Sequence, residues 1–386
     1  MNGFTRWWRT VGVLVGLELR QRTRATRWRV LLGLFFLVVS AVVLGLMWFI
    51  TTSSPDNGWQ TFTENLYFIV LGFVGFLGLV ISPTMTATSI NGDRKDATLA
   101  VVQATPVSGL QLAIGKLLGA WLASCALLAV ASPYLIWGIA VVEYPLAYSV
   151  LGVLAVSLIF LSYCGIGLGF SALLSRPIGS AAVTQLAVLF LLVGLPLITV
   201  LLVPATESRV TAMRPEYTYI DDDTSVCTLK PESVTVTHTE RIWWLTSPNP
   251  VVILADAAAQ RDYGRDADRG SRPGRYVDYT NSDEHAARRP SPSGLAAIAD
   301  LVAETRVPPN ANQDSTCPRR SSSGLRIDGD VVYGGSETSR DRERYLGHSW
   351  YWGLLANLAL GGIGLAFAAR RLRVPASRLP RGVRIA

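Results

Sequence analysis

Six long runs without charged residues constrain this chain more than any other feature. They cover residues 30–50, 66–90, 117–142, 144–175, 177–204 and 349–369. About 20 apolar residues are enough for an α-helix to cross the hydrocarbon of a bilayer. A soluble protein does not bury six such helices in its core, and half of all the residues here are hydrophobic. The pattern therefore predicts an all-α polytopic membrane protein with six transmembrane helices.

Lysine and arginine are distributed unevenly around these runs. Of the 35 basic residues, 17 lie before residue 30, in the loop 91–116, at Arg176 or after residue 369, and the short loops opposite hold none. The other 18 lie in residues 204–348, a segment too long to count in the positive-inside rule. We therefore expect a multi-pass protein of the cell membrane with both termini and the loop 91–116 in the cytoplasm.

The ends of the chain are predicted to lie on the inner membrane surface. Residues 1–29 place Val11, Leu14 and Leu19 on one face of a basic helix, which is typical of a helix in the membrane interface. Glu18 and Arg22 are spaced i, i+4, so they can pair. This helix is either an anchor only, or its polar face, with Glu18, Arg20 and Arg22, also supports a cytoplasmic partner. Residues 370–386 form a basic cytoplasmic tail.

The loop 91–116 separates the second and third runs. It opens with an expected glycine turn at Gly92 and a charged group at residues 93–96, followed by a short amphipathic run. Thr105 and Pro106 then provide an N-cap and a first helical residue. We expect a short helix, a break and a second helix that enters the membrane. The alternative is a plain solvated turn with a positive-inside signal.

Residues 204–348 are predicted to form a large mixed extracytoplasmic domain between the fifth and sixth helices. Residues 231–240 alternate valine and threonine and favour a strand or hairpin arm. Residues 243–259 are too short to span, so we expect a re-entrant or surface-lying pair of helices. Residues 293–306 suit an amphipathic helix. Cys227 and Cys317 are the two cysteines of this segment, and we predict that they pair in an oxidising compartment.

Several catalytic patterns are missing from the sequence. Gly115-Lys116 lacks the surrounding residues of a phosphate-binding loop, and no Gly-x-Ser-x-Gly turn is present. The three histidines are scattered, so no metal site is expected. The predicted spans contain no charged residues at depth, unlike carriers driven by ion gradients. We therefore expect no ATPase activity or cofactor in this chain, an energy source on another subunit, and an apolar or amphipathic cargo.

Three stretches, in this order, resemble the permease subunit of type-2 ABC exporters, the family that moves drugs, lipids and polysaccharides. Residues 1–29 are similar to its connecting helix. Residues 93–99, 105–108 and 115–116 are similar to its coupling-helix region. Asn249-Pro250 and residues 254–257 resemble the Asn-Pro segment of its re-entrant hairpin. Ala97 stands where a glycine is common, and the outer segment is longer than the family's usual hairpin.

The resemblance implies a dimer of permeases, identical or homologous, on separate nucleotide-binding ATPase subunits that hold ATP and magnesium. It implies a role in ATPase coupling for ten residues, namely Asp93, Arg94, Lys95, Asp96, Thr98, Leu99, Val102, Thr105, Pro106 and Ser108. It also implies that Asn249, Pro250 and Asp256 belong to the re-entrant segment. The membrane lipid is a further partner, and nucleic acid is not expected because the outer segment has a net charge of about −4.

Two other functions remain open at this point. The chain could be a membrane-anchored sensor or scaffold whose outer domain binds an envelope ligand or protein. It could also be an ABC-powered mechanical transmitter to an envelope partner. Co-purification of a nucleotide-binding subunit distinguishes both ABC-linked functions from the sensor.

Overall fold

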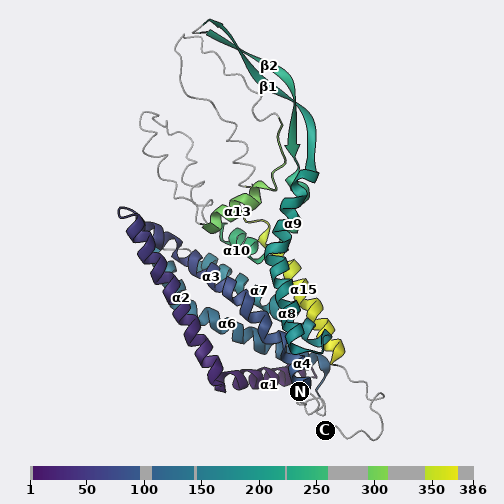
Figure 1. Ribbon diagram of the computed structural model, residues 1–386. Helices are drawn as coiled ribbons and strands as arrows, with labels where there is room; N and C mark the ends of the chain where they lie inside the picture. The colour runs from purple at the N-terminus through teal and green to yellow at the C-terminus, as the bar shows by residue number, and fades with distance from the viewer. Residues whose placement is uncertain are drawn as a thin grey trace.

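A computed structural model describes residues 3–95, 107–142, 146–221, 224–259, 294–311 and 344–372. These residues are mostly helical (Figure 1). Six stretches of the described residues are long and apolar enough to cross a membrane, which confirms the predicted number. They are α2 (Thr26–Ser53), α3 (Gly58–Ala87) with α4 (Ser89–Lys95), α6 (Gly109–Val142), α7 (Leu146–Leu173), α8 (Pro177–Leu189) with its continuation, and α15 (Trp350–Arg371).

The centre of the bundle is formed by α3, α6 and α7. Large side chains such as Phe62, Tyr67, Phe160 and Tyr163 are fully enclosed there. The Tyr67 hydroxyl donates a hydrogen bond of 2.7 Å to the carbonyl of Ser149, which joins α3 to α7. By contrast, only 17% of the most apolar window is buried in α2 and in the fifth stretch. These two stretches therefore present their apolar side chains to the surroundings of the bundle.

Helices α7 and α15 approach each other closely through glycines. A Cβ on Gly165 would lie 2.5 Å from the carbonyl oxygen of Gly361, and one on Gly169 would lie 2.6 Å from the Cα of Gly364. Only residues without a side chain allow this contact, as in small-residue helix interfaces of membrane proteins. The last helix is thereby held against the centre of the bundle, although about 180 residues separate the two elements in sequence.

Helix α1 (Gly3–Arg24) is present where an amphipathic helix was predicted, and it lies across one end of the bundle (Figure 1). The same end holds α4 and the last turn of α15, because Ile90, Leu112, Ala369 and Leu372 belong to one buried cluster. We call this the α1 end of the bundle.

The fifth stretch is not a regular helix. After α8, residues form a π-helical turn, η1 (Phe190–Gly194), and then α9 (Leu195–Leu202) and a 3₁₀ turn, η2 (Val203–Thr206). Pro196 is at the start of α9. A proline there removes one helical donor, and a π turn is one way to accommodate it.

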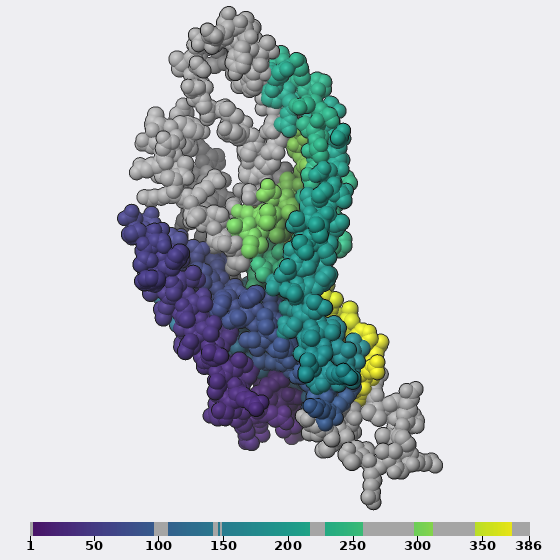
Figure 2. Space-filling view, viewed as in Figure 1, coloured from purple at the N-terminus to yellow at the C-terminus, as the bar shows by residue number. Residues whose placement is uncertain are grey.

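Beyond α9 the chain forms a long two-stranded ribbon at the opposite end from α1. Strand β1 (Glu207–Asp221) pairs antiparallel with β2 (Thr224–Thr237), from Glu207 opposite Thr237 to Asp221 opposite Thr224. The space-filling view shows this ribbon standing away from the helices (Figure 2). The predicted strand at residues 231–240 is thus part of a longer hairpin, and β1 was not predicted because Pro215 and its charged residues interrupt the alternation.

Short helices connect the ribbon to α15. They are η3 (Thr239–Arg241), η4 (Trp243–Leu245), α10 (Pro250–Ala259) and α13 (Gly294–Glu304). The helix predicted at 293–306 is present as α13. Of the pair of helices predicted at 243–259, α10 is a helix and η4 is a single 3₁₀ turn. Ala255 of α10 packs with Ala299 and Ala303 of α13 and with Leu346 in a small buried cluster.

Candidate functional site

Helix α1 is fixed to α6 by two glycines of α6. A Cβ on Gly115 would lie 2.7 Å from the Cβ of Leu14, and one on Gly119 would lie 2.7 Å from the Cβ of Glu18. Real Cβ atoms do not approach so closely, so α1 rests in a groove that only these glycines leave open. The four-residue spacing in both helices brings Leu14 and Glu18 onto successive turns of α6.

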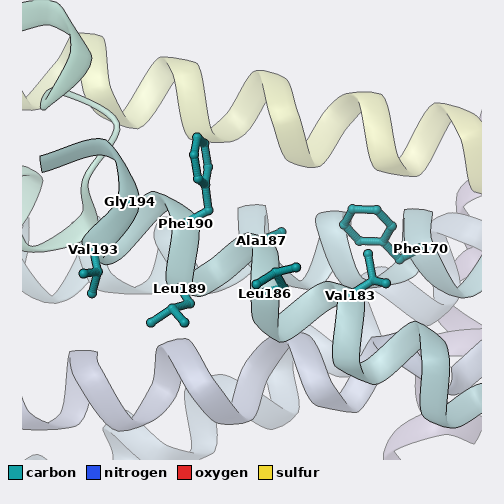
Figure 3. A pocket seen from close by; sticks show the side chains of 8 residues that line it. All are labelled: Phe170, Val183, Leu186, Ala187, Leu189, Phe190, Val193 and Gly194. Atoms are coloured by element: carbon teal, nitrogen blue, oxygen red, sulfur yellow. The ribbon is translucent and has the colours of Figure 1, made fainter. Parts of the chain in front are cut away.

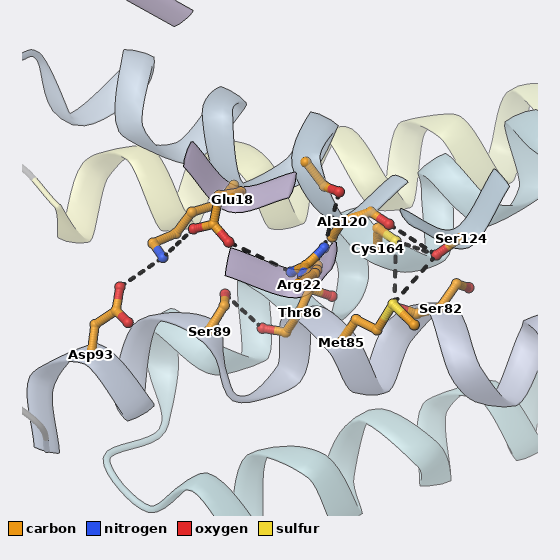
Figure 4. A network of polar contacts seen from close by, with 12 residues as sticks. Glu18, Arg22, Ser82, Met85, Thr86, Ser89, Asp93, Ala120, Ser124 and Cys164 are labelled. Carbon is orange, nitrogen blue, oxygen red and sulfur yellow. Dashed lines mark hydrogen bonds and ion pairs between the residues drawn. The ribbon is translucent and has the colours of Figure 1, made fainter. Parts of the chain in front are cut away.

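Charged residues from three helices meet beside this contact. Lys116 Nζ of α6 lies 2.8 Å from Glu18 Oε1 of α1 and 2.6 Å from Asp93 Oδ2 of α4. Arg22 lies 3.7 Å from the other oxygen of Glu18 and donates a bond of 2.9 Å to the carbonyl of Gly119. Figure 4 shows Glu18, Arg22 and Asp93 around these ion pairs. We call Glu18, Arg22, Asp93 and Lys116 the ionic junction.

The ionic junction is nearly neutral and largely shielded from water. Two carboxylates face two cations, and the Lys116 side chain is only 8% exposed. A shielded ammonium group needs its partners, since an isolated charge is expensive to bury. The predicted pair of Glu18 and Arg22 is confirmed, but it faces α6 rather than the outside. Arg20 is the exposed member of the predicted set.

The beginning of α6 is stabilised by a reciprocal cap. The Ser108 amide donates to Gln111 Oε1 at 2.8 Å, and the Gln111 amide donates to Ser108 Oγ at 3.2 Å. This is the capping-box arrangement of a serine and a glutamine three residues later. The helix thus begins at Gly109, so the prediction that Thr105 and Pro106 start it was wrong, because this cap satisfies two amides at once. Ser108, predicted for coupling, therefore caps α6.

The glycine turn predicted at Gly92 was also wrong, because this residue lies inside α4. The Gly92 amide donates to the Thr88 carbonyl at 2.9 Å. Ser171 Oγ of α7 accepts bonds from the amides of Ile90 at 3.0 Å and Asn91 at 3.3 Å. Helix α4 is thereby attached to α7 as well as to α6.

The remaining coupling residues divide into two groups. Arg94 and Lys95 end α4 with exposed side chains, one and two residues after Asp93. Asp96, Thr98, Leu99, Val102, Thr105 and Pro106 lie outside the described residues. Of the ten predicted coupling residues, the structure therefore describes Asp93, Arg94, Lys95 and Ser108, and Arg94 and Lys95 are the exposed basic ones.

A second group of contacts holds the predicted re-entrant segment. Asn249, which is 3% exposed, accepts bonds from the amides of Val251 at 2.8 Å and Val252 at 3.4 Å and so caps α10. Its Nδ2 donates to the carbonyl of Leu192 at 2.8 Å. Leu192 lies four residues before Pro196, which has no N–H to offer that carbonyl. One side chain thus links α10 to the irregular turn in the fifth stretch.

Asp256 of α10 holds the beginning of α15. Its Oδ1 accepts a bond of 2.7 Å from the Gly347 amide. Its Oδ2 accepts bonds from the Ser349 amide at 2.7 Å, the Ser349 hydroxyl at 2.6 Å and the Trp350 amide at 2.8 Å. A buried carboxylate is well suited to the amides at a helix N-terminus. Pro250, the third predicted residue, begins α10.

Arg306 was not singled out from the sequence. Its guanidinium lies 4.3 Å from the ring centre of Trp243 and 4.9 Å from that of Tyr345, and it donates to the Tyr345 carbonyl at 3.2 Å. Burial lowers the pKa of Arg306, while the charge of Asp256 acts in the opposite direction. Arg306 therefore joins η4 to the segment before α15.

An open groove runs along the fifth stretch. It has a volume of about 580 Å³ and is lined by Phe170 of α7 and by seven residues between Val183 and Gly194 (Figure 3). All the lining side chains are apolar. Where the structure describes the chain, no three His, Cys, Asp or Glu side chains gather closely enough to hold a metal ion.

The predicted disulfide concerns residues that the structure describes only in part. Cys227 lies in β2 opposite Tyr217, and Cys317 lies outside the described residues. Their pairing stays a prediction.

Comparison with models of known protein families and with curated proteins finds no match for this chain.

Proposed function

We propose that the chain is the membrane-spanning permease subunit of an ATP-binding-cassette exporter. In this proposal a separate nucleotide-binding subunit holds ATP and magnesium and supplies the energy. A hydrophobic or amphipathic substrate, such as a drug, a peptide or a lipid, moves outward. The observation that carries the proposal is the position of two exposed basic residues, Arg94 and Lys95, directly beside the ionic junction.

The contacts of the ionic junction suit the transmission of a movement. A partner that engages Arg94 and Lys95 would displace the end of α4. The ion pair of Asp93 with Lys116 would pass that displacement to α6, and the pair of Lys116 with Glu18 would pass it to α1. Because α1 also rests on Gly115 and Gly119, it would move with α6 as one unit.

The proposed orientation places the α1 end in the cytoplasm at the cell membrane. Exposed arginines support it, since Arg20, Arg24 and Arg27 flank the turn between α1 and α2, and Arg370 and Arg371 end α15. Basic residues near span ends favour the cytoplasmic side. Both termini would then be cytoplasmic, and the ribbon would be outside.

Exposed apolar surfaces support a second permease copy and an apolar cargo. The α2 helix and the fifth stretch bury few of their side chains within the chain. The groove beside Phe170 and Phe190 offers only carbon-rich side chains. Such surfaces suit lipid, another permease subunit or a hydrophobic substrate, and they do not suit an ion.

The test is co-purification of the chain with its nucleotide-binding ATPase subunit. The full chain carries an affinity tag and is extracted from its native membranes in a mild detergent. We expect an ATPase subunit to co-purify in stoichiometric amount, and lipids or amphipathic drugs to stimulate ATP hydrolysis in nanodiscs. Recovery of the chain without any nucleotide-binding subunit, from membranes that contain one, would contradict the proposal.

The ribbon favours a second candidate function, an ABC-powered mechanical transmitter. Strand β1 follows α9 through the single turn η2, so a movement of the fifth stretch would pass directly to the ribbon. Deletion of residues 207–237, with a short glycine-serine linker in their place, distinguishes the two. An exporter would keep substrate-stimulated ATPase activity and transport, whereas a transmitter would keep ATPase activity alone.

A further inference from the structure

A serine, a histidine and a glutamate form a chain of hydrogen bonds at the base of the ribbon. Ser208 Oγ of β1 lies 2.9 Å from His238 Nε2, and His238 Nδ1 lies 2.7 Å from Glu240 Oε1. All three side chains are half-buried. The ionic junction and the re-entrant segment use none of them.

The ribbon brings these residues together by its register. The His238 amide donates to the Thr206 carbonyl at 3.2 Å, and Ser208 pairs with Val236. Residues 206 and 238 are therefore opposite each other, and Ser208 lies one diagonal step away on the same face of the ribbon. Glu240 follows two residues later in η3 and reaches back to the other ring nitrogen. The arrangement thus follows from pairing at the ribbon's base.

The contacts determine which nitrogen of His238 carries hydrogen. A carboxylate only accepts, so the contact of Glu240 with Nδ1 is a hydrogen bond when Nδ1 carries the proton. Neutral His238 then presents a lone pair at Nε2 to the Ser208 hydroxyl. The three groups are thus arranged in the order of a nucleophile (Ser208), a general base (His238) and a carboxylate that orients the base (Glu240). The other oxygen of Glu240 is buried and has no hydrogen-bond partner among the described residues.

The ribbon also directs a backbone amide beside Ser208 away from β2. Antiparallel pairs alternate between hydrogen-bonded and non-hydrogen-bonded rungs. Because the rung of Thr206 and His238 is bonded, the rung of Arg209 and Thr235 is not, so the Arg209 amide points away from β2. An amide directly after a nucleophile is suited to accept the negative charge of a tetrahedral intermediate.

We propose that Ser208, His238 and Glu240 form an acyl-transfer site that cleaves esters. Ser208 Oγ bonds to the carbonyl carbon while its proton passes to His238 Nε2. The bond from that carbon to the alcohol oxygen then breaks, and His238 returns the proton to the departing alcohol. Water repeats the sequence on the acyl-serine and releases the acid. Glu240 orients the ring and stabilises its charged form.

The position of the site indicates the class of ester. The candidate span 177–206 ends two residues before Ser208, so the site is at the membrane boundary. The ester group of a membrane lipid lies at this boundary and can reach Ser208 from the bilayer. A water-soluble ester has no need of a site at the membrane boundary. We therefore assign lipid-borne acyl esters as the substrate class. This site is independent of the proposed transport function.

The test uses the full chain in nanodiscs and a fluorophosphonate probe, followed by mass spectrometry of the labelled peptide. We expect one adduct on Ser208 in the wild type, none in Ser208→Ala, and labelling slower by about 10²-fold or more in His238→Ala and Glu240→Gln. Glu240→Gln keeps the size and the acceptor oxygen, so it separates catalysis from folding. Ser233→Ala, on the exposed part of β2, is the matched control and should label like the wild type.

Hydrolysis of a short-chain p-nitrophenyl ester in the same nanodiscs should follow the same order. A wild-type protein that acquires no adduct on Ser208 would overturn the assignment. Equal labelling rates in His238→Ala and in the wild type would also overturn it. That result would mean that His238 only holds the base of the ribbon together and does not activate Ser208.

Discussion

The side-chain amide of Asn249 donates a hydrogen bond of 2.8 Å to the carbonyl of Leu192, the acceptor that Pro196 cannot serve. Asn249 thus supplies the hydrogen-bond donor that the helix lacks at Pro196. The same side chain also caps α10. This contact ties α10 to the fifth stretch.

The first prediction concerns this contact. Asn249→Ser keeps a capping oxygen but is too short to reach Leu192, so a buried carbonyl loses its donor. We expect a loss of about 1–3 kcal/mol in the free energy of unfolding, measured by thermal or denaturant unfolding in detergent. Pro196→Ala supplies an N–H at position 196, so the same serine substitution should cost less in that background. An equal cost in both backgrounds would show that Asn249 does not serve the Leu192 carbonyl.

The second prediction concerns Asp256, which is 1% exposed and accepts four hydrogen bonds. Asp256→Asn keeps the volume but removes the charge and turns an NH₂ group toward donors. We expect about 2–4 kcal/mol of destabilisation, since each bond to a charged group contributes about 1.5–3 kcal/mol. The exposed Glu304→Gln of α13 is the control and should be neutral. Unchanged stability of Asp256→Asn would mean that the carboxylate does not hold the start of α15.

The third prediction concerns the groove in which α1 lies. Gly119→Val adds carbons where Glu18 Cβ already lies, so α1 should leave α6. The arginines at the end of α1 should then become more sensitive to trypsin, measured by the rate of cleavage in nanodiscs. Gly12→Ala is a suitable control because a Cβ there meets nothing within 4 Å. Equal cleavage rates for Gly119→Val and the wild type would contradict this packing.

The fourth prediction concerns Lys116. Lys116→Met leaves Glu18 and Asp93 facing each other without their shared cation. We expect a destabilisation of roughly 1–3 kcal/mol, less than for a fully buried pair because Asp93 is partly exposed. Glu18→Gln added to Lys116→Met should recover part of the loss. If the double variant loses as much as both single variants together, the two residues are not coupled.

The sequence was sufficient for features that depend on local composition. The six spans follow from hydropathy, and the helix at 294–304 follows from its amphipathic spacing. The start of α6 was misjudged because a Thr-Pro pair and a capping box lie within a few residues of each other in the sequence. The pair of Ser108 and Gln111 satisfies two amides at once. Strand β1 was not predicted because its residues do not alternate between apolar and polar. Pairing with β2 holds it in the strand conformation.

Long-range contacts could not be predicted from one sequence. Lys116 was visible as a basic residue at the edge of a span, but its two carboxylate partners come from α1 and α4, about 98 and 23 residues away. Asn249 and Asp256 were singled out by resemblance, which did not indicate what they hold. Arg306 and the group at Ser208 carry no local motif. Their roles depend on tertiary packing and on strand register.

The most direct test of the central proposal is the charge-reversed double variant Arg94→Glu and Lys95→Glu. Both side chains are exposed, so the chain should fold and keep its thermal stability. The measurement is substrate-stimulated ATP hydrolysis together with transport, in proteoliposomes that contain the co-purified ATPase. We expect transport and stimulation to be lost, while the matched variant Arg370→Glu and Arg371→Glu, at the end of α15, retains both. Full coupled transport by the Arg94→Glu and Lys95→Glu variant would contradict the proposed coupling function of these residues.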